Sequence, residues 1–116
     1  MKRFNPQWLN KPRKRSGLEG RIQLQIIHYL KMKGAAVGKT KTMGVRDGGH
    51  YRFDIYTFRG FPDLTCFINN TLYFIEVKSP RGIQSPEQQT FELLCHQAGI
   101  HYILAKSLED VISVIK

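Results

Sequence analysis

The sequence predicts an α/β domain in which a mixed β-sheet is flanked by helices, in the order α-β-β-β-α-β-α. Apolar residues recur at helical spacing in three segments that each begin with a capping signal, and residues 62–78 alternate in the manner of a β-hairpin. A chain of 116 residues with 41% apolar residues can form one modest core and is too short for two. We therefore expect one domain over residues 16–116, preceded by a basic arm.

The arm, residues 1–15, holds six basic residues and no acidic residue. A segment of this composition is expected to be poorly ordered. It either contacts phosphates or serves as a solvated tail, and the sequence leaves both roles open.

The first helix should begin at Ser16 and run to about Lys33, before Gly34. Ser16 and Glu19 have the spacing of a capping box, in which the two side chains cap the helix reciprocally. The stripe expected to face the core consists of Ile22, Ile26 and Leu30, with Ile27 beside it. Glu19 falls on the same stripe, so it is either a capping residue or part of a functional site.

Residues 34–60 are rich in Gly, Thr, Lys and Arg, and they favour one or two strands, the better candidate over residues 51–58, with a flexible loop over residues 46–49. Gly34 to Thr40 resembles a nucleotide-binding P-loop, but it follows a helix and has one residue too few between its glycines. We therefore expect no nucleotide cofactor. Lys39, Lys41 and Arg46 are interpreted as part of a basic surface.

The C-terminal third predicts a helix, a strand and a short helix. The first of these should begin at Pro86, after Ser85, and end near Ala98, before Gly99. The strand over residues 101–105 should run parallel to residues 71–78, because a helix separates the two. The last helix should follow Ser107, and its expected apolar stripe is Leu108, Val111, Ile112 and Ile115.

The net charge of +9, with a pI near 9.8, favours a polyanionic partner, and nucleic acid is the commonest one inside cells. No apolar run approaches the roughly 20 residues that cross a bilayer, and neither a secretory signal nor a membrane-inserting basic helix is visible. Cys66 and Cys95 fit a reducing intracellular setting better than a disulfide framework. The four histidines lack the spacing of a zinc site. We expect an intracellular protein, cytoplasmic or nucleoid-associated, with no membrane partner.

The hairpin holds the candidate catalytic residues. Asn69-Asn70 is its turn signal, because asparagine tolerates the left-handed conformation that tight hairpins require. If these two residues form the loop, Asp63 lies directly opposite Glu76, with Cβ atoms about 5 Å apart, and alternation places Lys78 on the same face. The other face is apolar throughout and carries Leu64, Cys66, Ile68, Tyr73, Ile75 and Val77.

Two carboxylates about 5 Å apart repel each other by about 3 kcal/mol at an effective dielectric of 20. A divalent cation offsets this naturally, since Mg²⁺ binds through one or two carboxylates, waters and substrate phosphates. Lys78 could then orient or deprotonate a water molecule, or stabilise charge on a phosphoryl oxygen. The alternative is a salt bridge from Lys78 to either carboxylate on an exposed face, and the spacing alone does not exclude it.

Pro62-Asp63, twelve intervening residues and Glu76-Val77-Lys78 resemble the PD-(D/E)xK nuclease signature. Together with Glu19 in the first helix, residues 60–64, residues 85–88 and Gly99, the pattern is similar to the VRR-NUC family of virus-type replication and repair nucleases. The resemblance covers residues 16–115 and implies a restriction-endonuclease-like core.

The resemblance implies metal-dependent cleavage of DNA phosphodiester bonds. Asp63, Glu76 and the main-chain carbonyl of Val77 would bind Mg²⁺ or Mn²⁺, and Glu19 would join them directly or through a water. Lys78 would position the attacking water, with Gln88 beside it. Gln88 could instead be only the capping partner of Ser85. Small members of the family also imply a homodimer, which would suit a branched substrate such as a Holliday junction or a flap.

The basic residues expected to hold the DNA backbone are Arg46, Arg52, Arg59, Arg81, Lys39 and Lys41. Two rival functions remain open: a non-catalytic nucleic-acid-binding module on the same fold, and a sequence-specific restriction-type nuclease. A compact nuclease of this kind would be at home in a phage or bacterial genome.

Overall fold

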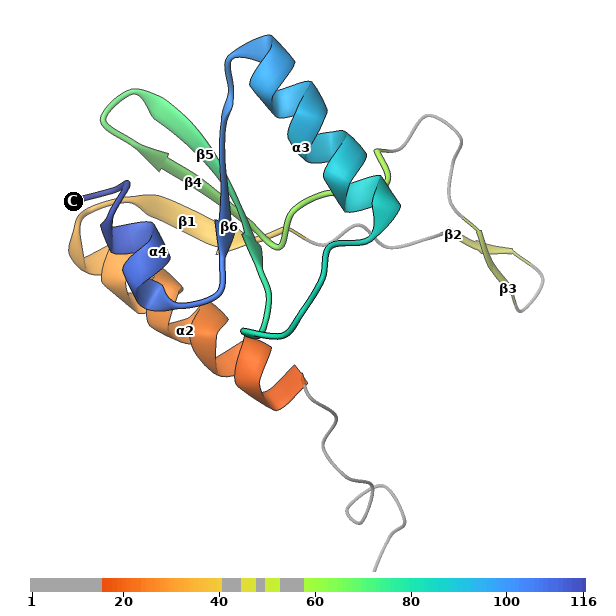
Figure 1. Ribbon diagram of the computed structural model, residues 1–116, viewed down its shortest axis with the longest axis horizontal. Coiled ribbons are helices and arrows are strands. Elements are labelled where there is room, and N and C mark those ends of the chain that lie inside the picture. Colours follow the sequence, from red (N-terminus) through yellow and green to blue (C-terminus); the bar gives the residue numbers. More distant parts are fainter. Residues whose placement is uncertain (1–15, 41–44, 48–49, 53–57) are drawn as a thin grey trace, which may run out of the picture.

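The computed structural model describes residues 16–40, 45–47, 50–52 and 58–116, and the side chains of residues 17–40 and 58–116 (Figure 1). The predicted arm, residues 1–15, lies outside this description. The elements are α2 (Ser16–Met32), β1 (Ala36–Lys39), β2 (Val45–Asp47), β3 (His50–Arg52), β4 (Leu64–Ile68), β5 (Thr71–Val77), α3 (Pro86–Ala98), β6 (His101–Ala105) and α4 (Leu108–Ile112).

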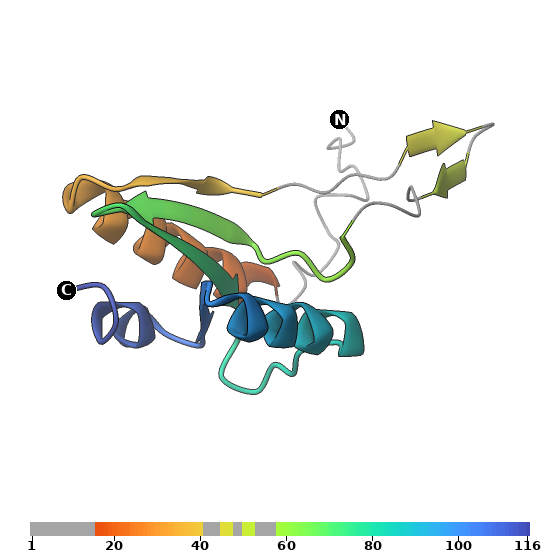
Figure 2. The ribbon, with the colours of Figure 1, turned by 90° about the horizontal axis from the view of Figure 1, so that it is seen from above.

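The predicted α/β class with a mixed, helix-flanked sheet is confirmed. Four strands form one sheet in the order β1-β4-β5-β6, in which β1, β4 and β5 are antiparallel neighbours and β6 runs parallel to β5. Helices α2 and α4 pack on one face of this sheet, and α3 packs on the other (Figures 1 and 2). The sheet is therefore the middle layer of three.

The segment between α2 and the hairpin differs from its prediction. It holds β1, which contains Gly38 and Lys39 of the P-loop lookalike, and β2 and β3 pair with each other as a separate two-stranded sheet. The element order therefore contains more strands than predicted. Arg46 and Asp47, expected in a loop, lie in β2, and the strand expected over residues 51–58 is described only as far as Arg52. Short strands rich in glycine and charged residues lack the apolar alternation on which strand prediction depends.

The hairpin register is confirmed. Asn69 and Asn70 both have positive φ, 53° and 60°, as a two-residue type I′ turn requires. Ile68 pairs with Thr71, and the ladder continues to Leu64 opposite Ile75. Because side chains alternate between faces, this register decides which residues face each helix layer.

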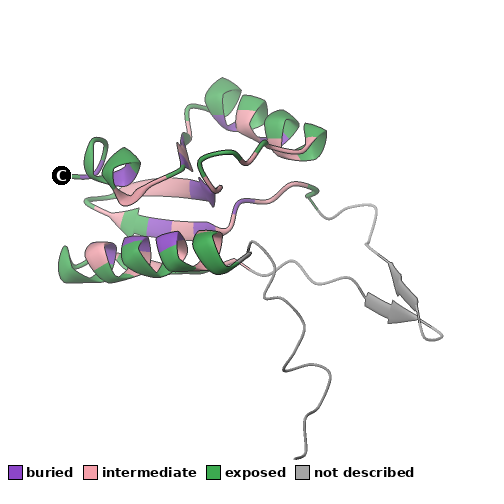
Figure 3. Ribbon diagram, turned by 60° about the horizontal axis from the view of Figure 1, so that its bottom comes forward, coloured by how far each residue is buried: buried purple, intermediate pink, exposed green. Residues whose placement is uncertain are grey.

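The main core lies between the sheet and the layer of α2 and α4 (Figure 3). Its buried residues include Ile22, Ile26 and Leu30 of α2, as predicted, together with the apolar face of the hairpin. A smaller cluster lies on the opposite face, where Phe91 and Cys95 of α3 pack against Tyr102 of β6. Both cysteines are free and buried.

One detail of the predicted helix faces is wrong. Ile112 of α4 is exposed, although it was placed on the apolar stripe of its helix. Helix α4 is only five residues long, so it turns Val111 towards the core and Ile112 away, while Ile115 reaches the core from beyond the helix end. No helix in the described part of the chain is long and apolar enough to cross a membrane.

Replacing Ile26 with Ala should lower the free energy of unfolding by about 2–5 kcal/mol, because its side chain is fully buried and a cavity would remain. Urea denaturation followed by circular dichroism measures the change. Leu24→Ala on the same helix is the control, since Leu24 is 51% exposed and its loss should change stability far less. Equal losses for the two variants would contradict the placement of the core.

Candidate active site

The hairpin register brings Asp63 and Glu76 together at one end of the sheet. Asp63 directly precedes β4, and its main-chain oxygen accepts a 2.8 Å hydrogen bond from the N–H of Thr40. Its side-chain Oδ2 accepts a 2.8 Å hydrogen bond from the N–H of Val77, the residue after Glu76. The carboxylate is thereby held against the end of β5, as the predicted pairing requires.

Glu76 is the central residue of the site. Its side chain is 1% exposed, and it is the buried charged residue among those that the structure describes. Its Oε2 accepts a 2.8 Å hydrogen bond from Nε2 of Gln88 and lies 3.5 Å from Nζ of Lys78. Its other oxygen, Oε1, is buried and has no hydrogen-bond partner among the described residues. A buried carboxylate oxygen without a partner is costly unless a ligand satisfies it.

The electrostatics of the pair follow from burial and proximity. Burial is the main cause that raises the pKa of Glu76, and the negative charge of Asp63 raises it further. The positive charge of Lys78 opposes these effects only in part, so the pKa is about 8. Burial also raises the pKa of Asp63, although the N–H of Val77 opposes this. Both carboxyl groups therefore bind a proton more readily than ordinary carboxyl groups do, and a bound cation would oppose this.

Lys78 stands at the mouth of the site, where 17% of its side chain is exposed. Its backbone N–H donates a 2.9 Å hydrogen bond to the carbonyl of Ala105. Its Cβ packs against Gly82, where an added Cβ would lie 3.1 Å away. The ammonium is thus attached to a fixed backbone and faces both solvent and Glu76. The salt bridge considered as an alternative is present, but it lies inside the site and not on an exposed face.

Gln88 caps helix α3 and also hydrogen-bonds Glu76. Its backbone N–H donates to Oγ of Ser85 at 3.2 Å and its Oε1 accepts from the N–H of Ser85 at 2.8 Å, which completes a capping box at the start of α3. Since Oε1 is engaged there, the amide nitrogen is the end left to meet Glu76. The cap therefore fixes the orientation of the amide that holds Glu76.

Glu19 lies at the border of the site. Its Oε1 accepts a 3.3 Å hydrogen bond from the N–H of Ser79, so its carboxylate connects α2 with the loop after β5. Its negative charge contributes to the raised pKa of Asp63. Within the described ranges, however, no three His, Cys, Asp or Glu side chains are grouped closely enough to hold a metal ion.

Val77 contributes through its backbone. In an extended strand, the N–H and C=O of one residue point to the same side. Because the N–H of Val77 points to Asp63, its carbonyl is directed to that side as well. The oxygens that the chain presents here are therefore carboxylate and carbonyl oxygens.

Gly60 is a residue of the site whose role sequence reasoning missed. Its φ is +71°, and a Cβ at this position would clash with the carbonyl of Glu87 and the backbone nitrogen of Gln88. The segment that leads into Asp63 is thus pressed against the first turn of α3. The Gly60-Phe61-Pro62-Asp63 sequence was a visible signal, but the contact joins segments that are distant along the chain.

A comparison with solved structures supports the fold. A structure named "VRR_NUC domain" aligns with a TM-score of 0.63 and 22% sequence identity, and the alignment covers 84% of this chain and 94% of that chain. This protein has the VRR_NUC fold. The fold that the sequence resemblance implied is thereby confirmed. No protein-family model and no curated protein matches the sequence.

The basic residues of this VRR_NUC-fold chain are only partly described. Arg59 and Arg81 are exposed in the segments that precede Asp63 and follow Lys78, and Lys39 is exposed at the end of β1. Arg46 and Arg52 lie in β2 and β3, but their side chains are outside the description, as is Lys41 altogether. The described cations therefore lie on segments next to the carboxylates.

In a metal chelator, the stability of this protein should fall as the pH rises from about 4.5 to about 8. The folded state keeps the Glu76 proton up to its raised pKa of about 8, whereas the unfolded chain loses it near the ordinary value of 4.5. The unfolded state then binds fewer protons, so a higher pH favours unfolding. Thermal melts across this range measure the effect. The Glu76→Gln variant should show a shallower decline, and an equal slope in both proteins would contradict the assignment.

Gly60→Ala should destabilise the protein by about 1–3 kcal/mol or more, since the new methyl group would overlap the α3 backbone at an already left-handed φ. Gly38→Ala is the matched control, because no atom lies within 4 Å of a Cβ at that position and its φ is not positive. Denaturant titration of both variants compares them. A Gly60→Ala protein as stable as Gly38→Ala would show that the contact is not tight.

Proposed function

We propose that this protein is a Mg²⁺- or Mn²⁺-dependent endonuclease that hydrolyses phosphodiester bonds in structured DNA, such as four-way junctions or flaps. The observation that carries the proposal is the pair of half-buried Asp63 and buried Glu76, with a free Glu76 oxygen on one side and Lys78 on the other. A binding module has no need of carboxylates that face a polyanion.

The residues of the site fit a hard divalent cation. Such cations take oxygen ligands, and Oε1 of Glu76 is a buried carboxylate oxygen without a described partner. Asp63 and the carbonyl of Val77 supply further oxygens on the same side, and Glu19 could act through a water. A bound Mg²⁺ or Mn²⁺ would neutralise phosphate charge and make water more acidic.

Side chains of the protein itself orient the ligand oxygen, the water molecule and the DNA backbone. Gln88 occupies Oε2 of Glu76 and so directs the free oxygen, Oε1, to the ligand. Lys78 is placed to orient a water molecule beside the scissile phosphate or to donate a hydrogen bond to a phosphoryl oxygen. Arg59, which precedes Asp63, and Arg81, which follows Lys78, contact the DNA backbone on the two sides of the site. Backbone contacts position a duplex without reading its sequence, so selectivity for shape and strong salt dependence follow.

The homodimer that the sequence resemblance implies belongs to the same proposal. A junction has two equivalent strands to cut, and a two-fold symmetric enzyme presents one active site to each. Two copies of the protein would then act together on one branched DNA molecule.

The test compares junction, flap, linear duplex and single-stranded DNA, each with Mg²⁺, Mn²⁺ or EDTA. We expect cleavage of branched DNA with either metal and none in EDTA. Asp63→Asn and Lys78→Ala should each lower the rate by about 100-fold or more while junction binding, measured by fluorescence anisotropy in EDTA, persists. The controls are Glu109→Gln and Lys31→Ala, which alter an exposed carboxylate and an exposed ammonium on other parts of the surface.

Each alternative result has its own meaning. Junction binding without cleavage under any metal condition would favour the non-catalytic module. Cutting of linear duplex at fixed sequences would favour the restriction-type nuclease. Cleavage that survives Asp63→Asn would refute the assignment of the site.

A further inference from the structure

The loop between β5 and α3, residues 78–85, carries an exposed apolar side chain next to the candidate site. Ile83 of this loop is 82% exposed. Figure 2 shows the loop projecting past α3. A single exposed apolar side chain is ordinary on a protein surface. The position of Ile83 is informative because the loop is held to the rest of the fold on both sides of it.

The first half of the loop is a closed turn. The N–H of Gly82 donates a 2.8 Å hydrogen bond to the carbonyl of Ser79, and Pro80 takes the second position of the turn, where its fixed φ fits. The N–H of Ser79 donates in turn to Oε1 of Glu19 at 3.3 Å. A Cβ on Gly82 would lie 3.1 Å from the Cβ of Lys78. The turn is therefore held against α2 and against Lys78.

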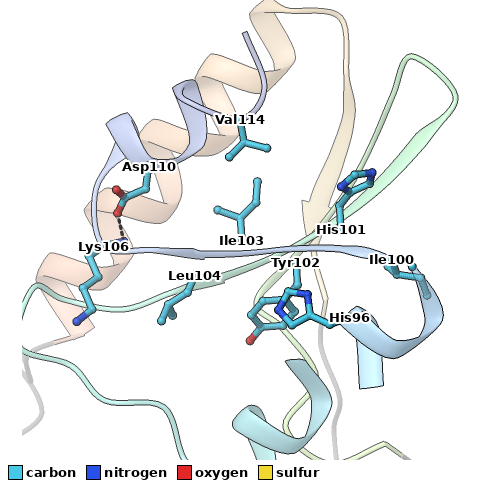
Figure 4. Close-up of a pocket in the computed structure, with 10 residues that line it drawn as sticks. His96, Ile100, His101, Tyr102, Ile103, Leu104, Lys106, Asp110 and Val114 are labelled. Atoms are coloured by element: carbon cyan, nitrogen blue, oxygen red, sulfur yellow. Dashed lines mark hydrogen bonds between the residues drawn. The ribbon is translucent and has the colours of Figure 1, made fainter. Parts of the chain in front are cut away.

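The second half of the loop is anchored through Gln84. Its Nε2 donates hydrogen bonds to the hydroxyl of Tyr102 and to Oε1 of Glu92, both at 3.1 Å. Its main-chain carbonyl accepts a 3.3 Å hydrogen bond from Nε2 of Gln89. Figure 4 shows Tyr102 and Ile103 on opposite sides of β6, and Tyr102 lies on the side of α3. Gln84 thus holds the end of the loop to β6 and to α3 at once.

Ile83 lies between these two anchors. Gly82 before it packs against Lys78, and the side chain of Gln84 after it turns inwards, so the backbone directs Ile83 to solvent. Isoleucine is branched at Cβ, which restricts its χ1 angle. Ile83 is therefore a stiff apolar projection from a fixed loop.

The surroundings of Ile83 are cationic. Residues 78–85 include Lys78 and Arg81 and no acidic residue, and Arg81 is exposed two positions before Ile83. Positive charge on both sides favours a polyanion over an apolar protein segment as the ligand. In DNA, the phosphates match Arg81, and the faces of the bases offer the apolar surface that Ile83 can contact.

The stacking of DNA decides where such a contact can form. In a continuous duplex each base face is covered by its neighbour, and an inserted apolar side chain has to separate the two bases at a cost in free energy. At a branch point the stack is already interrupted, so this cost is lower. An apolar projection therefore discriminates between branched and continuous DNA without reading the sequence.

We propose that Ile83 is a wedge that inserts into the interrupted base stack at the branch point of structured DNA, and that it determines the preference of this protein for branched over linear DNA. Arg81 holds a neighbouring phosphate. Since Lys78 belongs to the same fixed loop, the wedge also sets the position of the cut relative to the branch point. The inference rests on the proposed function for its ligand, but its test needs no cleavage.

The test measures binding of the full chain to a four-way junction, a flap and a linear duplex in EDTA by fluorescence anisotropy. Ile83→Ala should raise the dissociation constant for both branched DNAs about tenfold, because most of an apolar side chain is removed from a contact with bases. It should leave the dissociation constant for linear duplex near that of the wild type. Since Ile83 is exposed, the melting temperature without DNA should not change.

Four further variants separate a wedge from a general surface effect. Ile83→Leu keeps the apolar volume and should retain most of the preference for branched DNA. Ile83→Lys adds a charge in place of the wedge, so it should strengthen binding of linear duplex and lose the preference. Arg81→Ala should weaken binding of both kinds of DNA and lower the dependence on salt. Leu93→Ala, at a residue of α3 that is 55% exposed, should change neither.

Fluorescence of 2-aminopurine gives an independent measure, since this base analogue becomes brighter when it is unstacked. With the analogue beside the branch point of the junction, saturating wild-type protein in EDTA should raise the fluorescence. Ile83→Ala at saturation should raise it far less, and Leu93→Ala should match the wild type. An analogue placed far from the branch point should not respond to any of the proteins.

Several results would overturn the inference. One is an equal loss of binding to branched and linear DNA in Ile83→Ala, and another is full preference for branched DNA in Ile83→Lys. A protein that binds no DNA would overturn it as well. A melting temperature or state of association that changes in Ile83→Ala without DNA would show that protein covers this side chain, and would also overturn it.

The wedge and the nuclease can fail separately. If branched DNA is bound through Ile83 but is not cut with any metal, the proposed nuclease is refuted and the wedge stands. If branched DNA is cut and Ile83→Ala keeps the wild-type preference and fluorescence, the wedge is refuted and the nuclease stands.

Discussion

The register of the β4–β5 hairpin is the constraint on which the rest of the structure depends. Asn69 and Asn70 adopt the two left-handed conformations of a tight turn, and this turn sets Leu64 opposite Ile75 and Asp63 beside the end of β5. Shifting the pairing by one residue would exchange the faces of an entire strand. The apolar face would leave the core under α2, and the carboxylates would separate.

A second constraint joins this hairpin to α3. Gln88 is held by Ser85 in the helix cap and in turn holds Glu76, so the start of the helix and the carboxylate are positioned together. Gly60 contacts the backbone of the same turn closely, so the segment that leads from Gly60 to Asp63 packs against α3. The site is therefore made by β4, β5 and α3 jointly, and its polar groups lie beside the smaller apolar cluster that packs those elements.

The carboxyl groups of Asp63 and Glu76 carry the strongest functional signal, because removal from water and mutual repulsion oppose their ionised forms. A divalent cation bound between them would offset both effects. The positive charge of the chain favours the approach of DNA.

The sequence by itself determined the α/β class, the hairpin register, the caps of α3 and the set of Asp63, Glu76 and Lys78, because each depends on local periodicity or on turn and cap chemistry. It did not determine β1, whose glycine and lysine lack apolar alternation, or the exposure of Ile112. Only the tertiary structure decided that Gln88 caps α3 and holds Glu76 at once, that Glu19 meets Ser79, that Gly60 must lack a side chain, and that β6 is the last of the four described strands in the main sheet. These contacts join residues far apart in the chain, and no local pattern specifies which distant segments will meet.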